Sequence, residues 1–340
     1  MKVGLKFLNL SLLIVTVITV IFIVELTSYL ILQNKRDYNK YALINKKVYD
    51  TQLDDNLGYV LKKNSIHQAR KFHSDGSLIY DVTYRTDEFR RRTVGQEYLP
   101  LKSHLILFGC SYAYGEGLKD MDTLQDMLGK RMPQYNVYNY AVHGWGPQQM
   151  LALLEPGRLP QEVKSNKGVA VYYFIYDHFN RAVGTMGRPW IYGFPYYRLD
   201  KDGVVQRDGS FKTGRALITY FYYFLYAMVD KSNFCHLINF SLSSKLTLKD
   251  IQLTVEIIKK AKQLYEEQFN GKFYVLIYPF DENRDPYLNE FVSLLKENGI
   301  AVLNFPLPKN EKSDYVIKHD GHPNAKLNEY LTDNLVQVLN

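Results

Sequence analysis

The sequence is poor in cysteine and has no long run of charges of one sign. Only two of its 340 residues are cysteines, Cys110 and Cys235, and this number excludes a disulfide framework as the basis of the fold. Lysine and arginine exceed the acidic residues to give a net charge of +7, but they are scattered along the chain. No nucleic-acid-binding motif accompanies them, so we expect no nucleic-acid partner. Tyrosine is abundant instead, with 29 residues, and its apolar ring with a polar tip suits membrane interfaces and sugar-binding clefts.

The longest stretch without a charge lies near the N-terminus. Residues 7–24 contain no charged side chain, and the apolar run resumes after Glu25 as far as Leu32. Such a run is long enough to span a bilayer. The short basic start also fits a signal peptide, but no clear small-x-small cleavage site follows it. We therefore predict an uncleaved signal anchor, a transmembrane helix over residues 1–34. The lysines that follow it favour a cytoplasmic location for the rest of the chain, although long translocated domains can override this bias.

Residues 35–77 are polar and rich in lysine, and we expect a juxtamembrane linker that becomes ordered towards its end. The stretch 78–85 is rich in strand-forming residues and follows a turn at Gly76, which predicts a hairpin or an edge strand. From there strands and helices alternate, which predicts a three-layer α/β/α domain over 78–340 with a doubly wound parallel sheet. Five stretches open on a sheet strand: 105–118, 136–150, 168–181, 272–285 and 300–306. Helical spacing of apolar residues marks 248–269 and 286–299.

An insertion at about 182–247 interrupts this alternation. Its first half contains the turn signals Asp202-Gly203 and Asp208-Gly209, which indicate an excursion into β structure. Its second half contains an apolar, aromatic run over 216–229 that is short for a membrane span. This run could cap the cleft, lie at a membrane interface or pack into the core. Core packing is the reading we favour.

Polar residues follow the ends of the predicted sheet strands. Ser111 comes after the first strand, Gly144 after the second, Tyr176 after the third, and Asp320 and His322 before the last helix. Because the carboxyl ends of parallel strands meet at one edge of a sheet, we expect these residues to lie close together.

This set of residues suits nucleophilic catalysis. A serine hydroxyl needs an adjacent base to take its proton, and His322 could be that base for Ser111. Asp320 would hold the imidazole in the required tautomer. Backbone N–H groups at Ser111 and Gly144 would face the oxyanion that develops in the transition state.

Other readings of the same residues stay open. His322 alone would be read as a structural loop histidine, but its Asp-Gly-His-Pro-Asn context favours catalysis. Cys110 could be the nucleophile instead of Ser111, although we expect its side chain to point into the core. A metal site at His319, Asp320 and His322 is conceivable, but no further ligand cluster supports it and we expect none. The basic stretch FRRR at 89–92 could contact an anionic group, and a solvated strand end is the reading we favour.

Three short blocks resemble those of the SGNH hydrolases, the GDSL-like esterase and lipase superfamily. They are FGCS at 108–111, NYAVHGWG at 139–146 and DGHPN at 320–324, in the order found in that family. The resemblance implies that Ser111 is the nucleophile, that Gly144 belongs to the oxyanion hole, and that Asp320 and His322 complete the triad.

The sequence departs from the family pattern at several positions. Cys110 stands where many members carry aspartate. The third block usually supplies an asparagine to the oxyanion hole, and here that position reads Tyr176-Asp177. Asn180, or the hydroxyl of Tyr176, could serve as the donor. The histidine follows the aspartate by two residues rather than three, which is similar to membrane-anchored and exported members that modify glycans.

The resemblance implies a membrane-anchored serine esterase or acyltransferase without a cofactor. The expected substrate is an acylated carbohydrate, with O-acetyl groups on a cell-envelope or secreted glycan, and the expected place of the catalytic domain is extracytoplasmic. One alternative is a lipase or thioesterase that admits acyl chains along the aromatic insertion. The other is an inactive domain that partners a polytopic membrane acyltransferase.

Overall fold

The computed structural model describes residues 2–35, 49–73, 75–95, 97–100, 102–184, 189–213, 216–240, 242, 246–279, 286–307 and 309–339. One described helix, α1 (Lys2–Lys35), is long and apolar enough to cross a membrane, judged by length and composition over Asn9–Gln33. Thr16 and Thr19 lie in this segment, and each hydroxyl donates to the carbonyl oxygen four residues earlier at 2.8 Å. These bonds satisfy the hydroxyl groups within the helix, which keeps its surface compatible with lipid.

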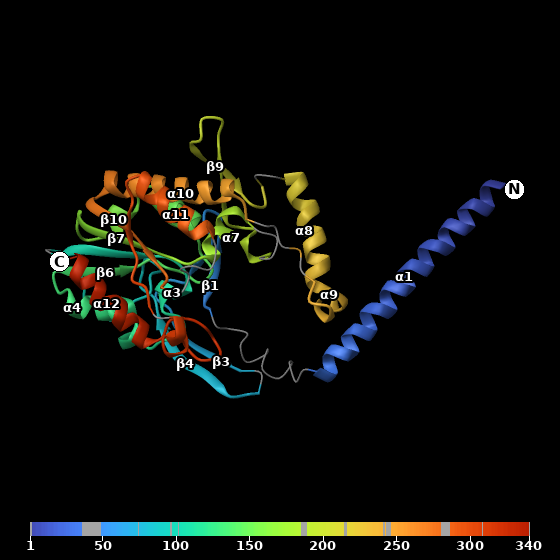
Figure 1. The fold of residues 1–340 in the computed structure, drawn as a ribbon, viewed down its shortest axis with the longest axis horizontal. Coiled ribbons are helices and arrows are strands. Elements are labelled where there is room, and N and C mark those ends of the chain that lie inside the picture. Colours follow the sequence, from blue (N-terminus) through green and yellow to red (C-terminus); the bar gives the residue numbers. More distant parts are fainter. Residues whose placement is uncertain are drawn as a thin grey trace.

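A five-stranded parallel sheet forms the centre of the domain (Figure 1). Its strands are β5 (Ser103–Phe108), β6 (Tyr135–Asn139), β7 (Lys167–Phe174), β10 (Asn270–Ile277) and β11 (Ala301–Leu303), in the order β11-β10-β7-β5-β6. Every neighbouring pair is parallel. The apolar runs of the sequence form these strands because both faces of the sheet are covered. The predicted doubly wound α/β fold is therefore confirmed, with a last strand shorter than the predicted 300–306.

Helices cover both faces of the sheet (Figure 1). One layer contains α10, which contacts α5, α7 and α11, and the other contains α12, which contacts α4. The bounds are α4 (Leu124–Arg131), α5 (Pro147–Leu154), α7 (Asp177–Val183), α10 (Leu248–Gln268), α11 (Pro286–Glu297) and α12 (Ala325–Leu339). Short helical turns are α3 (Ser111–Tyr114), η2 (Asp120–Asp122), α6 (Leu159–Glu162), η3 (Pro189–Ile191) and η4 (Lys309–Asp314).

Two antiparallel hairpins precede the sheet in sequence. The first pairs β1 (Thr51–Asp54) with β2 (Gly58–Leu61), and the second pairs β3 (Ile66–Phe72) with β4 (Leu78–Arg85). The second hairpin contains the predicted strand at 78–85. The first hairpin and β3 lie in the stretch for which we expected a linker, and three of their apolar side chains are fully buried: Val60, Leu61 and Ala69. The hairpins thus belong to the same hydrophobic core as the sheet, and residues 36–48 of the expected linker lie outside the described residues.

The insertion forms a hairpin followed by two helices. The hairpin is β8 (Pro195–Leu199) with β9 (Val205–Ser210), and it confirms the predicted β excursion. The helices are α8 (Ala216–Lys231) and α9 (Asn233–Leu237). Among the described side chains of 224–231 only Tyr226 is buried, so the favoured reading, core packing of the apolar run, is wrong for this part. An apolar run shows that water is avoided but does not show whether protein or lipid replaces it.

Candidate active site

The structure brings Ser111, Asp320 and His322 together although 211 residues separate the serine from the histidine. Strand β5 ends at Phe108, and Ser111 is the first residue of α3, at the carboxyl edge of the sheet. The Nε2 atom of His322 lies 2.8 Å from the Oγ atom of Ser111. The Nδ1 atom of His322 lies 2.5 Å from Oδ1 of Asp320. These two contacts form the hydrogen-bonded relay that a serine nucleophile requires.

Lys71 holds the second oxygen of the Asp320 carboxylate. Its ammonium group donates to Oδ2 at 2.5 Å, and Oδ1 also accepts the backbone N–H of His322 at 3.1 Å. The Asp320 side chain is fully buried, and burial alone would raise its pKa. Hydrogen bonds and charge from His322 and Lys71 outweigh burial and lower the pKa of Asp320 to about 2. The carboxylate therefore stays ionised and fixed in orientation.

A second carboxylate, Glu116, lies beside the same histidine. Its Oε2 atom is 3.5 Å from Nε2 of His322 and 2.9 Å from Nδ1 of His143. The Tyr49 hydroxyl donates to both carboxylate oxygens at 2.9 and 3.0 Å, and the Tyr80 hydroxyl lies 3.3 Å from Oε1. Burial raises the pKa of Glu116, but the bonds from His143 and Tyr49 and the nearby His322 lower it to about 2. A fixed negative charge thus faces the imidazole that would take the serine proton.

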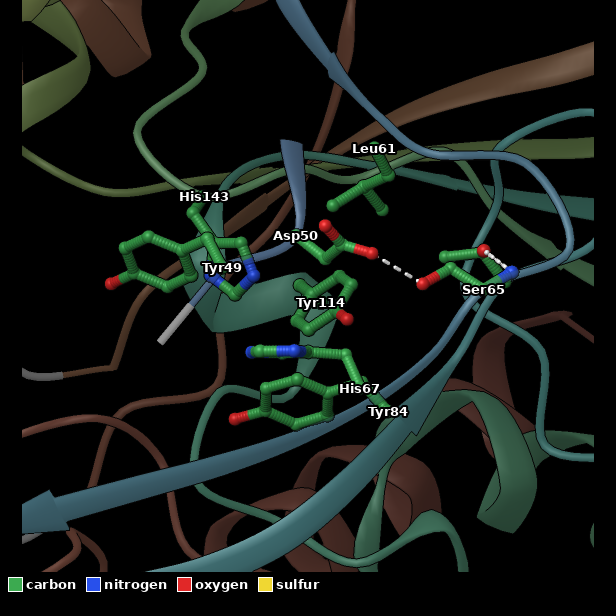
Figure 2. Close-up of a pocket in the computed structure, with 9 residues that line it drawn as sticks. Tyr49, Asp50, Leu61, Ser65, His67, Tyr84, Tyr114 and His143 are labelled. Atoms are coloured by element: carbon green, nitrogen blue, oxygen red, sulfur yellow. Dashed lines mark hydrogen bonds between the residues drawn. The ribbon is translucent and has the colours of Figure 1, made fainter. Parts of the chain in front are cut away.

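His143 forms a carboxylate–imidazole pair with Glu116, and the side chain of His143 is almost fully buried. Burial lowers the pKa of His143, and its Nδ1 atom lies within hydrogen-bond distance of the ionised Glu116 carboxylate. Figure 2 shows its ring beside that of Tyr49, at one wall of a cavity of about 10 Å³ that Tyr84 and Tyr114 also line. This volume is close to that needed by one water molecule and far too small for a substrate. The side chains around His143 are therefore closely packed and leave no room for a ligand there.

The loop that carries Ser111 and Glu116 is held by a buried arginine. Arg91 and Arg92 are 3% and 0% exposed, so the predicted solvated strand end is wrong. The Arg92 guanidinium donates to the carbonyl oxygens of Tyr114, Gly115 and Leu118 at 2.7 to 2.9 Å. Its central carbon lies 4.9 Å from the centre of the Tyr114 ring. Arg92 thereby satisfies carbonyl groups that the short helix α3 leaves open, which fixes the loop.

Gly144 follows β6 in a conformation that glycine favours. Its φ is +73°, and a Cβ atom there would lie 2.5 Å from the Tyr59 hydroxyl and 2.9 Å from the Trp190 ring. The Tyr59 hydroxyl donates to the carbonyl oxygen of His143 at 2.6 Å. Because the C=O and N–H of a trans peptide point in opposite directions, this bond fixes the direction of the Gly144 N–H. The expected role of Gly144 in the oxyanion hole stays a prediction, as does that of the Ser111 N–H at the start of α3.

The other two candidate oxyanion donors make local contacts. The side-chain amide of Asn180 donates to Asp177 of the same helix, α7, at 3.3 Å. The ring of Tyr176, at the start of α7, packs edge-on against Phe179 with ring centres 5.3 Å apart. These contacts do not join either residue to Ser111, and their role stays a prediction.

The sequence left two alternatives open, Cys110 as the nucleophile and a metal site at 319–322. Cys110 is fully buried and its thiol is a hydrogen-bond partner of Arg181, whereas Ser111 is the partner of His322. The group of possible metal ligands in the described residues contains Glu116 in place of the expected His319, with ligand atoms of Glu116, Asp320 and His322 within 4.8 Å of one another. However, the nitrogen and oxygen atoms of this group are already engaged with Ser111, Lys71 and each other. The His319 ring instead lies against His73, with ring centres 4.3 Å apart.

Sequence reasoning missed Lys71, Glu116 and His143, and it missed the contacts of Arg92. Glu116 gave a faint signal, since it is an acidic residue between two glycines shortly after the candidate nucleophile. His143 lies directly before Gly144 and could have been noticed for that reason. Arg92 belongs to the FRRR stretch that the sequence marked, but not as a support of this loop. Lys71 carries no local signal, because its partner is set by the packing of the second N-terminal hairpin.

Comparisons with known proteins gave matches among solved structures alone: no protein-family model matches the sequence, and no curated protein does. TesA is 14% identical, with a TM-score of 0.40, and the match covers 70% of this chain and 98% of that chain. A member of the lipolytic protein G-D-S-L family from Veillonella parvula DSM 2008 is 12% identical, with a TM-score of 0.41 and coverage of 69% and 97%. The psychrotrophic esterase EstA from Pseudoalteromonas sp. is 12% identical, with a TM-score of 0.39 and coverage of 69% and 96%. These TM-scores are below 0.5, so the likenesses are not used to assign a function. The assignment below depends on the geometry of the site.

Proposed function

We propose that this chain is a membrane-anchored serine esterase or acyltransferase of the SGNH type, which cleaves or transfers an ester-linked acyl group. The observation that carries the proposal is the relay from Ser111 through His322 to Asp320, with contacts of 2.8 and 2.5 Å. The charge pattern agrees with this use, because Asp320 and Glu116 remain ionised on either side of one imidazole.

In the first half of the reaction the Ser111 hydroxyl attacks the ester carbonyl. His322 takes the hydroxyl proton as the Oγ–C bond forms, and Asp320 stabilises the imidazolium that results. The N–H groups of Ser111 and Gly144 stabilise the oxyanion. The tetrahedral intermediate collapses, His322 returns the proton to the departing alcohol, and the acyl group remains on Ser111.

In the second half an acceptor hydroxyl attacks the acyl-enzyme. His322 takes the proton of this acceptor, and the Ser111 oxygen leaves and is protonated again. Water as acceptor gives an esterase, and a sugar hydroxyl gives an acyltransferase. The carboxylate of Glu116 lies 3.5 Å from Nε2 of His322 and favours the positively charged imidazole in both halves.

The proposed substrate is an O-acetyl group on a cell-envelope or secreted glycan. The resemblance of the three sequence blocks supports this choice and a domain outside the cytoplasm, and the apolar helix α1 supports a single membrane span. A reporter enzyme fused after residue 340 tests the location. Activity of the reporter in the cytoplasm alone would overturn the extracytoplasmic placement.

The activity is tested with the full chain in lipid nanodiscs. We expect hydrolysis of p-nitrophenyl acetate and labelling by a fluorophosphonate probe, both lost in Ser111→Ala and both retained in Cys110→Ala. A preference for long acyl chains would favour the lipase or thioesterase alternative. Loss of activity in Cys110→Ala with full activity in Ser111→Ala would assign the thiol as nucleophile. Neither labelling nor turnover would favour the inactive partner of a membrane acyltransferase.

A further inference from the structure

The two helices of the insertion present apolar side chains to solvent at helical spacing. Phe224 and Met228 lie one turn apart on α8, Phe234 and Ile238 lie one turn apart at α9, and Phe240 follows. Their exposed fractions range from 41% for Phe234 to 61% for Phe224. Helices with such an apolar face are typical of segments that lie in the plane of a membrane surface.

Helix α9 is docked on α1, the candidate membrane span (Figure 1). The carboxylate of Glu25 accepts the Ser232 hydroxyl, and it accepts the backbone N–H of Asn233 at 2.7 Å. Ser28, one turn further along α1, is 3% exposed, and Leu32 is partly buried. Residues 25, 28 and 32 share one face of a helix, so α9 covers a single stripe of α1.

The position of Glu25 fixes the depth of this contact. The uncharged segment 7–24 has a length of about 27 Å at the helical rise of 1.5 Å per residue. This length is close to the ~30 Å hydrocarbon thickness of a bilayer. Glu25 is the first charge after that segment and lies in the last third of the candidate span Asn9–Gln33, about 12 Å from the end of the span that leads to the domain. Helix α9, which is bound to Glu25, lies at the same level.

We propose that residues 216–240 form a second membrane contact, with α8 and α9 lying at the bilayer surface and their apolar faces in contact with lipid. We choose lipid as the partner of these apolar faces because α9 contacts α1, the helix that would cross the same bilayer. Lys231, exposed at the end of α8, is placed to approach anionic headgroups. The inference rests on the anchoring proposed for α1 and is independent of the esterase chemistry.

A second contact would hold the catalytic domain in one orientation. With α1 as the single anchor, the domain could rotate about the axis of α1. Membrane contacts of both α1 and the α8–α9 segment would hold the domain at two points and prevent this rotation. Figure 1 shows α8 and α9 between α1 and the sheet, so the contact lies on the side of the domain nearest the anchor. The site would then be held at a constant height above the bilayer.

The test uses the full chain in nanodiscs with a fluorescent NBD label on one introduced cysteine. The background is Cys235→Ser, because Cys110 is fully buried and shielded from the reagent. The label is placed at Ile238→Cys, and lipids with a nitroxide near the headgroup serve as quenchers. Val338→Cys on α12 is the matched control, since Val338 is 44% exposed against 54% for Ile238. We expect quenching at 238 to exceed that at 338 by about twofold or more, as for a residue buried at the interface.

A third label at Ile21→Cys separates this inference from the anchoring on which it rests. Quenching at 21 by nitroxides deep in the acyl chains shows that α1 is in the bilayer. Quenching at 238 no stronger than at 338, with 21 quenched, would overturn the lipid contact. In native membranes a photo-crosslinker at 238 should give lipid adducts, and a protein adduct in their place would show that another membrane protein covers this face.

Discussion

The ammonium group of Lys71 lies 2.5 Å from Oδ2 of Asp320, while the other oxygen of the same carboxylate accepts from His322. Lys71 belongs to β3, in the hairpin that precedes the sheet. A strand outside the central sheet thus fixes the orientation of a residue in the proposed catalytic relay.

Replacement of Lys71 by methionine should lower kcat with little change in KM. The carboxylate of Asp320 would lose the donor to its Oδ2 atom, and a loss of about 1.4 kcal/mol in transition-state stabilisation lowers the rate tenfold. Steady-state kinetics on an acetyl ester measures the effect, and Lys71→Arg should recover part of the rate. An unchanged kcat in Lys71→Met would show that His322 alone orients Asp320.

The proposed triad should behave as a unit. Ser111→Ala and His322→Ala should each lower turnover by ~10³-fold or more, and the double variant should lose little beyond either single change. Asp320→Asn should be milder, because it disturbs the orientation of the base without removing it. Circular dichroism should show all variants folded. Additive losses in the double variant would contradict a shared step.

Glu116→Gln should lower turnover by about tenfold, because a neutral amide does not stabilise the imidazolium through charge. The isosteric side chain keeps the contacts to Tyr49 and His143 within reach, so folding is preserved. Glu155→Gln is the matched control, since Glu155 pairs with Tyr197 and Arg207 at the insertion. Equal activities of the two variants would assign Glu116 a structural role alone.

The oxyanion donor from the third block is tested by Asn180→Ala and Tyr176→Phe. Loss of one donor lowers turnover by ~10²-fold in enzymes of this kind, so we expect such a loss in one of the two variants. The measurement is kcat on a small acetyl ester, with the melting temperature as control for folding. Full activity in both would mean that the backbone N–H groups suffice.

The depressed pKa of Asp320 predicts a loss of stability in acid. Its folded-state pKa is about 2, below the ordinary value of about 3.9, so the unfolded chain binds the proton more readily. The stabilisation is complete above pH ~4 and is lost as the pH falls towards 2. Between pH 5 and pH 3 the free energy of unfolding should fall by roughly 1 kcal/mol more in the parent than in Asp320→Asn. Urea unfolding of the solubilised full chain measures this difference, and parallel curves would contradict it.

The sequence was sufficient to predict the sheet and the meeting of Ser111 with His322. Apolar runs that alternate with helices specify a parallel sheet, and its carboxyl edge collects the residues that follow each strand. Lys71 and Glu116 escaped prediction because their partners depend on how hairpins and loops pack, which no spacing encodes. Core packing was predicted wrongly for residues 224–231 of α8 for a related reason. Side chains such as Phe224 avoid water equally well in a protein core and in lipid.

The distance of 211 positions along the chain from Ser111 to His322 has a consequence for biosynthesis. Translation produces Lys71, Arg92 and Ser111 long before it produces Asp320 and His322. A nascent or truncated chain that stops before residue 320 therefore carries a serine that nothing deprotonates. Under the proposed mechanism the chain remains inert during synthesis and insertion, and reactivity towards esters begins only when the loop at 320–322 docks against the completed sheet.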